Sequence, residues 1–195
     1  LPEQAQQAKA CVGYLPEQPP LYPEMTVQEY LTFAAELKSV KKAERKEQVC
    51  RAARRTGLET VLPRLIRSLS KGYKQRVGIA QALLGSPRLI ILDEPETGLD
   101  FHNQILVLNM VEQLAHEEGI SAIMNTHYPT NAMSVADEAL MLNRKGEFFY
   151  GPAAAILNEQ NISYSFDVQV IVDELNYQGR AVRSIVPVAL RGNAV

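Results

Sequence analysis

Three observations on the sequence predict an α/β fold built around a parallel sheet. Short apolar runs alternate with longer segments of helical periodicity, which is the order of elements in parallel α/β proteins. The run 89–92 is apolar at every position, as expected for a strand buried on both faces of such a sheet. The segments between the strands are long enough for right-handed helical crossovers.

Length and composition are those of an ordinary folded protein. The chain has 195 residues, 46% of them hydrophobic and 22% charged, which is enough to bury a core in one domain. The formal net charge of −2 argues against a nucleic-acid partner, since nucleic-acid-binding domains usually carry a basic excess. Cys11 and Cys50 form no metal-binding spacing, which indicates two reduced thiols in a cytosolic protein. No apolar run approaches the roughly 18 residues that span a bilayer.

The first strand and the first helix follow from local signals. Residues 11–15 form a short apolar run closed by four prolines, which predicts a strand and then an irregular bend. Thr26 and Glu29 have the spacing of a capping box, so a helix is expected to begin there.

A charged second helix is expected from residue 41 to residue 55. Its apolar face would carry Val49, Cys50 and Ala53, and Gly57 would form its C-cap. A third helix is expected from near residue 71 to residue 84, where Gly-Ser-Pro ends it. The later elements are an amphipathic helix (104–118), a strand (120–124), a short helix opened by Pro129, a hairpin (140–142 with 148–150) and a second hairpin (168–172 with 182–188).

Two adjacent carboxylates, Asp93 and Glu94, directly follow the strand 89–92. The carboxyl ends of parallel strands are where α/β sheets bind ligands. One carboxylate there can hold Mg²⁺ beside phosphates, and its neighbour can orient or deprotonate an attacking water. The plainer interpretation of such a pair is a strand end with two solvated acids.

Ser70 and Gly72 stand at the start of the helix expected from residue 71. The backbone amides of a helix N-terminus form a ready site for an anion such as phosphate. The plainer interpretation of Ser70 is an N-cap with no further role.

Together these residues resemble a known family. Leu-Ser-Lys-Gly-Tyr-Lys-Gln-Arg at 69–76 resembles the signature motif of ABC-family ATPases, and Leu-Asp-Glu-Pro at 92–95 resembles their Walker B motif. Gln18 looks like the glutamine of the Q-loop, residues 97–100 look like the D-loop, and His127 resembles the switch histidine. Glu96 departs from the pattern, because the family usually has Thr or Ser there.

The resemblance implies a P-loop NTPase-like parallel core with an inserted helical subdomain and a C-terminal β-hairpin. It implies ATP and Mg²⁺ as cofactors, Glu94 and His127 as catalytic residues, and Asp93 with Gln18 on the metal side. The residues implied in nucleotide binding are Gln18, Ser70, Lys71, Gly72, Gln75 and Asp100. The signature residues would serve ATP bound by the opposite subunit of a dimer.

No Gly-x-x-x-x-Gly-Lys-[Ser/Thr] loop occurs in the sequence. We therefore expect a partial ABC ATPase domain that lacks its N-terminal β portion and binds ATP weakly by itself. The expected parts within 1–195 are a Q-loop strand and loop (10–24), a helical subdomain with the signature motif (25–86), a core with Walker B, D-loop and switch histidine (87–160), and a C-terminal hairpin extension (161–195).

The expected function is that of the ATP-hydrolysing subunit of a prokaryotic ABC transporter. Its partners would be a second ATPase subunit, arranged head to tail, and a transmembrane permease contacted through the Q-loop region. The protein would be cytoplasmic and peripheral on the inner face of the membrane. Residues 13–92 resemble exporter cassettes, whereas the part from residue 99 resembles importers of iron-siderophores and cobalamin. Two alternatives stay open: a non-catalytic fragment that pairs with an intact cassette, and a soluble non-transport ABC ATPase.

Overall fold

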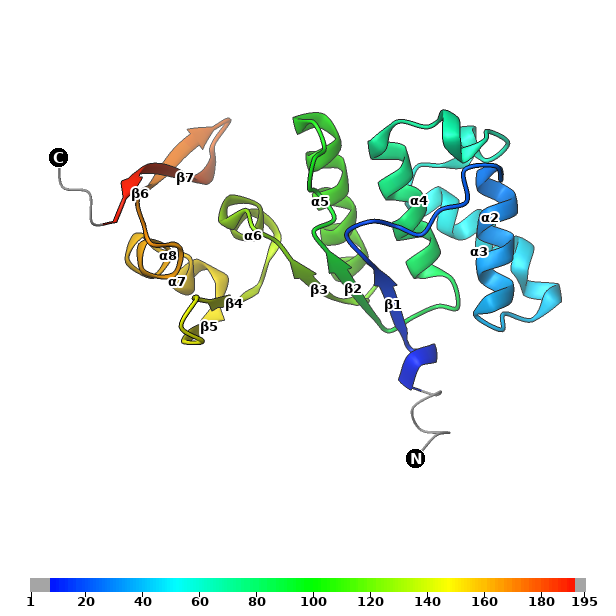
Figure 1. The fold of residues 1–195 in the computed structure, drawn as a ribbon, viewed down its shortest axis with the longest axis horizontal. Helices are drawn as coiled ribbons and strands as arrows, with labels where there is room; N and C mark the ends of the chain where they lie inside the picture. Colours follow the sequence, from blue (N-terminus) through cyan, green and yellow to red (C-terminus); the bar gives the residue numbers. More distant parts are fainter. Residues whose placement is uncertain (1–7, 192–195) are drawn as a thin grey trace. The chain divides into compact units, whose positions relative to one another are not determined.

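A computed structural model describes residues 8–191 (Figure 1). The chain separates into two compact units, Leu1–Asn125 and Thr126–Val195. The boundary falls within the segment 87–160 that was expected to form one core.

The first unit is built on a three-stranded parallel sheet, as predicted. Its strands are β1 (Val12–Leu15), β2 (Leu89–Asp93) and β3 (Ser121–Asn125), with β2 in the centre. One face carries Leu15, Ile90 and Leu92, which are fully buried beneath α4 (Lys71–Leu83) and α5 (Phe101–His116).

The opposite face of this sheet corrects one expectation. Leu89 and Ile91 are only half-buried, so β2 is not buried on both faces. Ile91 lies between Tyr14 and Ile123, whose side chains are 50% and 57% exposed. The sequence pattern of β2 is that of a fully covered strand, but this face is largely open within the first unit.

The helical part of the first unit contains α2 (Val27–Leu37), α3 (Lys42–Arg55) and α4, with short 3₁₀ turns at Glu59–Val61 and Ile66–Ser68. The predicted capping box is present, because Thr26 and Glu29 each accept a hydrogen bond from the other's backbone N–H. This exchange fixes the first turn of α2.

The buried face of α3 differs from the expected one at one residue. Val49, Ala52 and Ala53 are buried, whereas Cys50 is exposed. The i, i+3 and i+4 positions share one side of a helix, and the i+1 position lies about 100° away from it. Thr56 is the C-cap of α3, and Gly57 follows it with φ +61, as a Schellman ending requires.

The helix α5 begins earlier than the predicted residue 104, because Asp100 provides its N-cap. Leu108, Val111 and Leu114 are buried on it as expected for an amphipathic helix. Gly119 follows its end with φ +65.

The second unit contains both predicted hairpins. They are β4 (Glu138–Leu142) with β5 (Phe148–Pro152), and β6 (Val168–Tyr177) with β7 (Arg180–Leu190). Its helices are α6 (Pro129–Val135), α7 (Ala153–Ile156) and α8 (Glu159–Phe166). The core of this unit is formed by Met141, Ala153, Leu157 and Ile162. The two short helices α7 and α8 were not anticipated from the sequence.

Across residues 8–191, every helix is too short or too polar to cross a membrane.

Candidate functional site

Polar side chains gather where the three parallel strands end. Glu17 and Gln18 follow β1, Asp93 ends β2, and Asn125 ends β3. Asp93 and Asn125 are paired in register, and the Asn125 side-chain amide donates a hydrogen bond of 2.9 Å to Asp93 Oδ1. The structure thus brings the predicted acids and Gln18 to the same edge of the sheet, where α/β proteins bind ligands.

Glu94 has an unusual backbone conformation for its residue type. Its φ is +47, in the left-handed region that disfavours residues with a Cβ. Its backbone N–H donates to the Asn125 carbonyl at 3.0 Å, and its Oε2 accepts from the Thr97 hydroxyl at 2.9 Å. Strained backbone of this kind persists only where the surroundings hold it, and it is common at functional sites.

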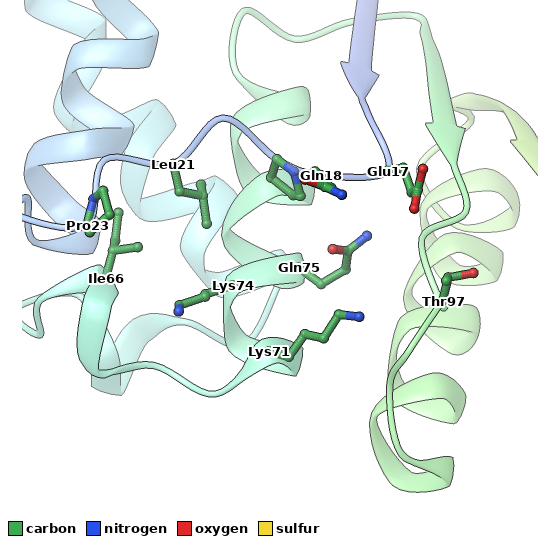
Figure 2. Close-up of a pocket in the computed structure, with 10 residues that line it drawn as sticks. Glu17, Gln18, Leu21, Pro23, Ile66, Lys71, Lys74, Gln75 and Thr97 are labelled. Carbon is green, nitrogen blue, oxygen red and sulfur yellow. The ribbon is translucent and has the colours of Figure 1, made fainter.

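A cavity of about 330 Å³ lies beside this edge of the sheet (Figure 2). It is lined by three predicted site residues, Gln18, Lys71 and Gln75. The other polar residues that line it are Glu17, Lys74 and Thr97, which were not among the predicted site residues, although Lys74 and Thr97 lie within the signature motif and the D-loop. With two lysines and one carboxylate among these lining residues, the charge balance favours an anionic ligand.

Ser70 is the N-cap of α4, since its Oγ accepts a hydrogen bond of 3.4 Å from the Tyr73 N–H. Capping therefore accounts for this serine within the chain, and a role toward a ligand stays a prediction. Lys71, the first residue of the 13-residue helix that it opens, reaches with its Nζ the place that a Cβ would take at Gly98.

Asp100 likewise has a local role as the N-cap of α5. Its Oδ1 accepts from the Asn103 backbone N–H at 2.8 Å, and both of its oxygens accept from the Asn103 side-chain amide at 2.9 Å. These bonds, the backbone one above all, lower the pKa of Asp100. Asp100 is therefore held ionised at the start of α5.

His127 and Glu96 are placed differently from the residues above. His127 belongs to the second unit, where it is exposed just before α6. Its part in the site remains a prediction. Glu96, the residue that departs from the family pattern, is fully buried.

The sequence of this chain is similar to those of ABC transporter proteins. A family model described as "ABC transporter" matches residues 2–97. An uncharacterised ABC transporter ATP-binding protein of Bacillus subtilis, YxlF, is 33% identical over 83% of this chain and 54% of its own length. The molybdenum import ATP-binding protein ModC of Pseudomonas aeruginosa is 33% identical over 82% of this chain and 44% of its own.

A solved structure with a similar fold is that of an ABC transporter assigned to the metal-chelate type, in an inward-facing conformation. The TM-score is 0.84 and the identity 26%, over 91% of this chain and 72% of that one. The chain spans about half the length of the two curated relatives named above.

Proposed function

We propose that this chain, which matches the ABC transporter family model over residues 2–97, forms part of an ATP-hydrolysing subunit in which Glu94 is the general base. The observation that carries the proposal is the conformation of Glu94. It directly follows a strand that is buried on one face, with φ +47, while the Asn125 carbonyl holds its backbone and the Thr97 hydroxyl holds its carboxylate. A solvated acid on the surface has no surrounding contacts that would hold its backbone in a strained conformation.

The chemistry follows from the position of the Glu94 carboxylate. A carboxylate held at the end of a strand can accept the proton of a water molecule as that water attacks the γ-phosphorus of ATP. The Thr97 hydroxyl fixes the Oε2 oxygen of this carboxylate. Lys71 and Lys74 supply positive charge at the cavity next to this turn.

The polar residues at the sheet edge fit Mg²⁺ as a cofactor. Mg²⁺ takes oxygen ligands, keeps several waters and usually binds through one or two carboxylates plus phosphates. Among the described residues no three His, Cys, Asp or Glu side chains form a metal cage. We propose the Asp93 carboxylate and the Gln18 amide oxygen as its protein ligands. The bound ion would neutralise phosphate charge.

We further propose that the nucleotide contacts are shared between two subunits placed head to tail. Ser70, Lys71, Gly72 and Gln75 would face the γ-phosphate bound by the partner, because the N-terminal amides of α4 favour an anion. Asp100 is proposed as a further nucleotide contact, and His127 is proposed as a second catalytic residue.

The surface after the Q-loop is proposed as the contact with a transmembrane permease. Tyr22 is 44% exposed and packs edge-on against Phe33, with ring centroids 5.7 Å apart. Half-exposed aromatic side chains of this kind are enriched at protein interfaces. The location that follows is the cytoplasmic face of a membrane.

The decisive experiment is an ATPase assay on Glu94→Gln, in a polypeptide where these 195 residues follow a Gly-x-x-x-x-Gly-Lys-[Ser/Thr] loop. The carboxamide keeps the shape but cannot take a proton, so phosphate release should fall by about 10²–10⁴-fold while ATP still binds. Glu24→Gln, an exposed acid of the same unit, is the matched control and should leave the rate unchanged. A Glu94→Gln rate within a few-fold of wild type would remove Glu94 from the role of base.

A further inference from the structure

Two turns of the first unit contact each other through their glycines. They are the signature turn (residues 69–73), which opens α4, and the D-loop (residues 97–100), which precedes α5. Each turn has a glycine whose missing Cβ leaves space for a side chain: Asn103, in the first turn of α5, fills it at Gly72, and Lys71, in the signature turn, fills it at Gly98. The two contacts run in opposite directions, one from α4 to the D-loop and one from α5 to the signature turn.

The contact at Gly72 involves Asn103. A Cβ at Gly72 would overlap with the side-chain amide of Asn103. That amide is fixed from the other side, because its Nδ2 donates to both Asp100 oxygens at 2.9 Å. Gly72 is therefore required by packing within the chain, whether or not a ligand approaches the turn.

The contact at Gly98 involves Lys71. Gly98 has φ +68, and a Cβ there would overlap with Lys71 Nζ. Figure 2 shows the Lys71 side chain extending from the first turn of α4 toward the segment that carries Thr97. Lys74, one turn further along α4, lines the same cavity but makes no such contact with a glycine of the D-loop.

We propose that the signature turn and the D-loop form one interlocked unit. Lys71 is the positioning residue for the D-loop, and Asn103 is the positioning residue for the signature turn. A ligand that displaces residues 70–72 would then displace residues 98–100, which lie only a few positions after Glu94. The interlock would connect the two loops of the proposed ATPase site, and only this consequence rests on the proposed function.

The first test measures amide hydrogen exchange on the 195-residue chain. In the D-loop, the Thr97 N–H donates to the Glu94 carbonyl and the Leu99 N–H to the Glu96 carbonyl, both at 3.2 Å, so both amides report on its order. Lys71→Ala should speed their exchange by about fivefold or more, because opening of the loop becomes easier. Lys71→Arg, which keeps the charge and the reach, should restore slow exchange.

Lys74→Ala is the matched control, since it removes the same charge from the same helix. Exchange at Thr97 and Leu99 should stay at the wild-type rate in this variant. The interlock is refuted if Lys71→Ala leaves both amides unchanged, or if Lys74→Ala speeds them equally.

The second test is a double-mutant cycle between Gly72→Ala and Asn103→Ala, read from unfolding midpoints. Gly72→Ala alone should lower the midpoint, because its Cβ meets the Asn103 amide. Shortening Asn103 opens the space, so the loss from Gly72→Ala should be smaller in the Asn103→Ala background. Strictly additive losses would overturn the contact as the reason for the glycine.

Neither readout requires ATP. An interlock that appears in both tests stands even if Glu94→Gln keeps its activity. A normal Glu94→Gln defect combined with additive cycles and unchanged exchange would remove the interlock and leave the proposed function in place.

Discussion

The Thr97 hydroxyl donates a 2.9 Å hydrogen bond to the Oε2 atom of Glu94, a residue whose own φ is +47. The bond spans a single turn, which the Thr97 N–H closes by donating to the Glu94 carbonyl at 3.2 Å. Backbone strain and a side-chain donor thus fix the direction of one carboxylate. The backbone strain at Glu94 lowers the stability of this turn, whereas the Thr97 hydrogen bond raises it.

The strain at Glu94 is expected to show in its stability. Glycine adopts φ +47 without the Cβ penalty, whereas alanine retains it. We expect Glu94→Gly to be more stable to urea than Glu94→Ala by about 1 kcal/mol, although both lose the Thr97 bond. Equal midpoints for the two variants would show that the backbone is relaxed there.

Lys38 should make the stability of the chain depend on pH. Its Nζ donates to the Ala82 carbonyl at 2.9 Å and to the Leu84 carbonyl at 3.1 Å, and burial lowers the pKa of this amine to about 8. The folded state therefore releases the proton more readily than the unfolded state, whose pKa stays near 10.5. Stability contributed by Lys38 is lowest below pH 8 and rises as the pH increases from 8 to 10.5.

The comparison with Lys38→Met isolates this effect. We expect the free energy of unfolding of wild type, measured with urea, to rise relative to that of Lys38→Met between pH 7 and pH 10.5. The expected rise is on the order of 1–3 kcal/mol. The difference should be flat below pH 8. A constant difference across the whole range would contradict the lowered pKa.

Gly13 is expected to tolerate no side chain. A Cβ at this position would overlap with the Ala82 carbonyl, and backbone cannot yield as the end of a side chain can. Gly13→Ala should cost about 3 kcal/mol through overpacking between β1 and α4. At Gly119 nothing lies within 4 Å of a Cβ, so Gly119→Ala should cost only about 1 kcal/mol for its φ of +65. Similar losses at the two sites would rule out the close approach.

Arg76 should stabilise the end of α3. Its Nη1 donates to the Thr56 and Gly57 carbonyls at 3.4 and 3.3 Å, and its guanidinium lies 4.1 Å from the centroid of the Tyr73 ring. Arg76→Met should lower the free energy of unfolding by about 1–2 kcal/mol, since carbonyls at a helix C-terminus lose a cationic donor. Arg76→Lys should recover part of this loss.

The exposed Arg67 provides the control for that prediction. Arg67→Met should change stability by no more than about 0.5 kcal/mol, as is usual for surface substitutions. If Arg76→Met and Arg67→Met lower the free energy of unfolding by the same amount, the carbonyl contacts of Arg76 contribute nothing to stability.

Local signals predicted the elements well where one short stretch of sequence decides the outcome. The capping box at Thr26 and the N-cap role weighed for Ser70 are examples, because each depends on residues at most three positions apart. The parallel order of the strands also followed from local patterns, since helical connections require it. Cys50 was misplaced although its spacing carried the answer, because only the i+3 and i+4 neighbours of Val49 share its face.

What the sequence could not predict depends on which distant segments meet. Asn103 carries no motif, and its role emerges only because α5 starts beside the first turn of α4. Thr97 and Lys74 line the cavity for the same reason. The half-open face at Ile91 was missed as well, because an apolar run does not reveal whether another element covers it.

The pairing of Val12 with Leu89 has a consequence for how the first unit folds. The β1–β2 ladder closes across the whole helical segment, whereas the β2–β3 ladder closes only across α5. Bringing distant strands together costs entropy before any contact repays it, so such parallel pairing is slow when it forms unaided. The helices α2 to α4 can form first, and α4 then offers β1 the surface on which Gly13 sits. We therefore expect substitutions that weaken α4, the helix that carries the signature turn, to slow refolding more than substitutions in the β6–β7 hairpin.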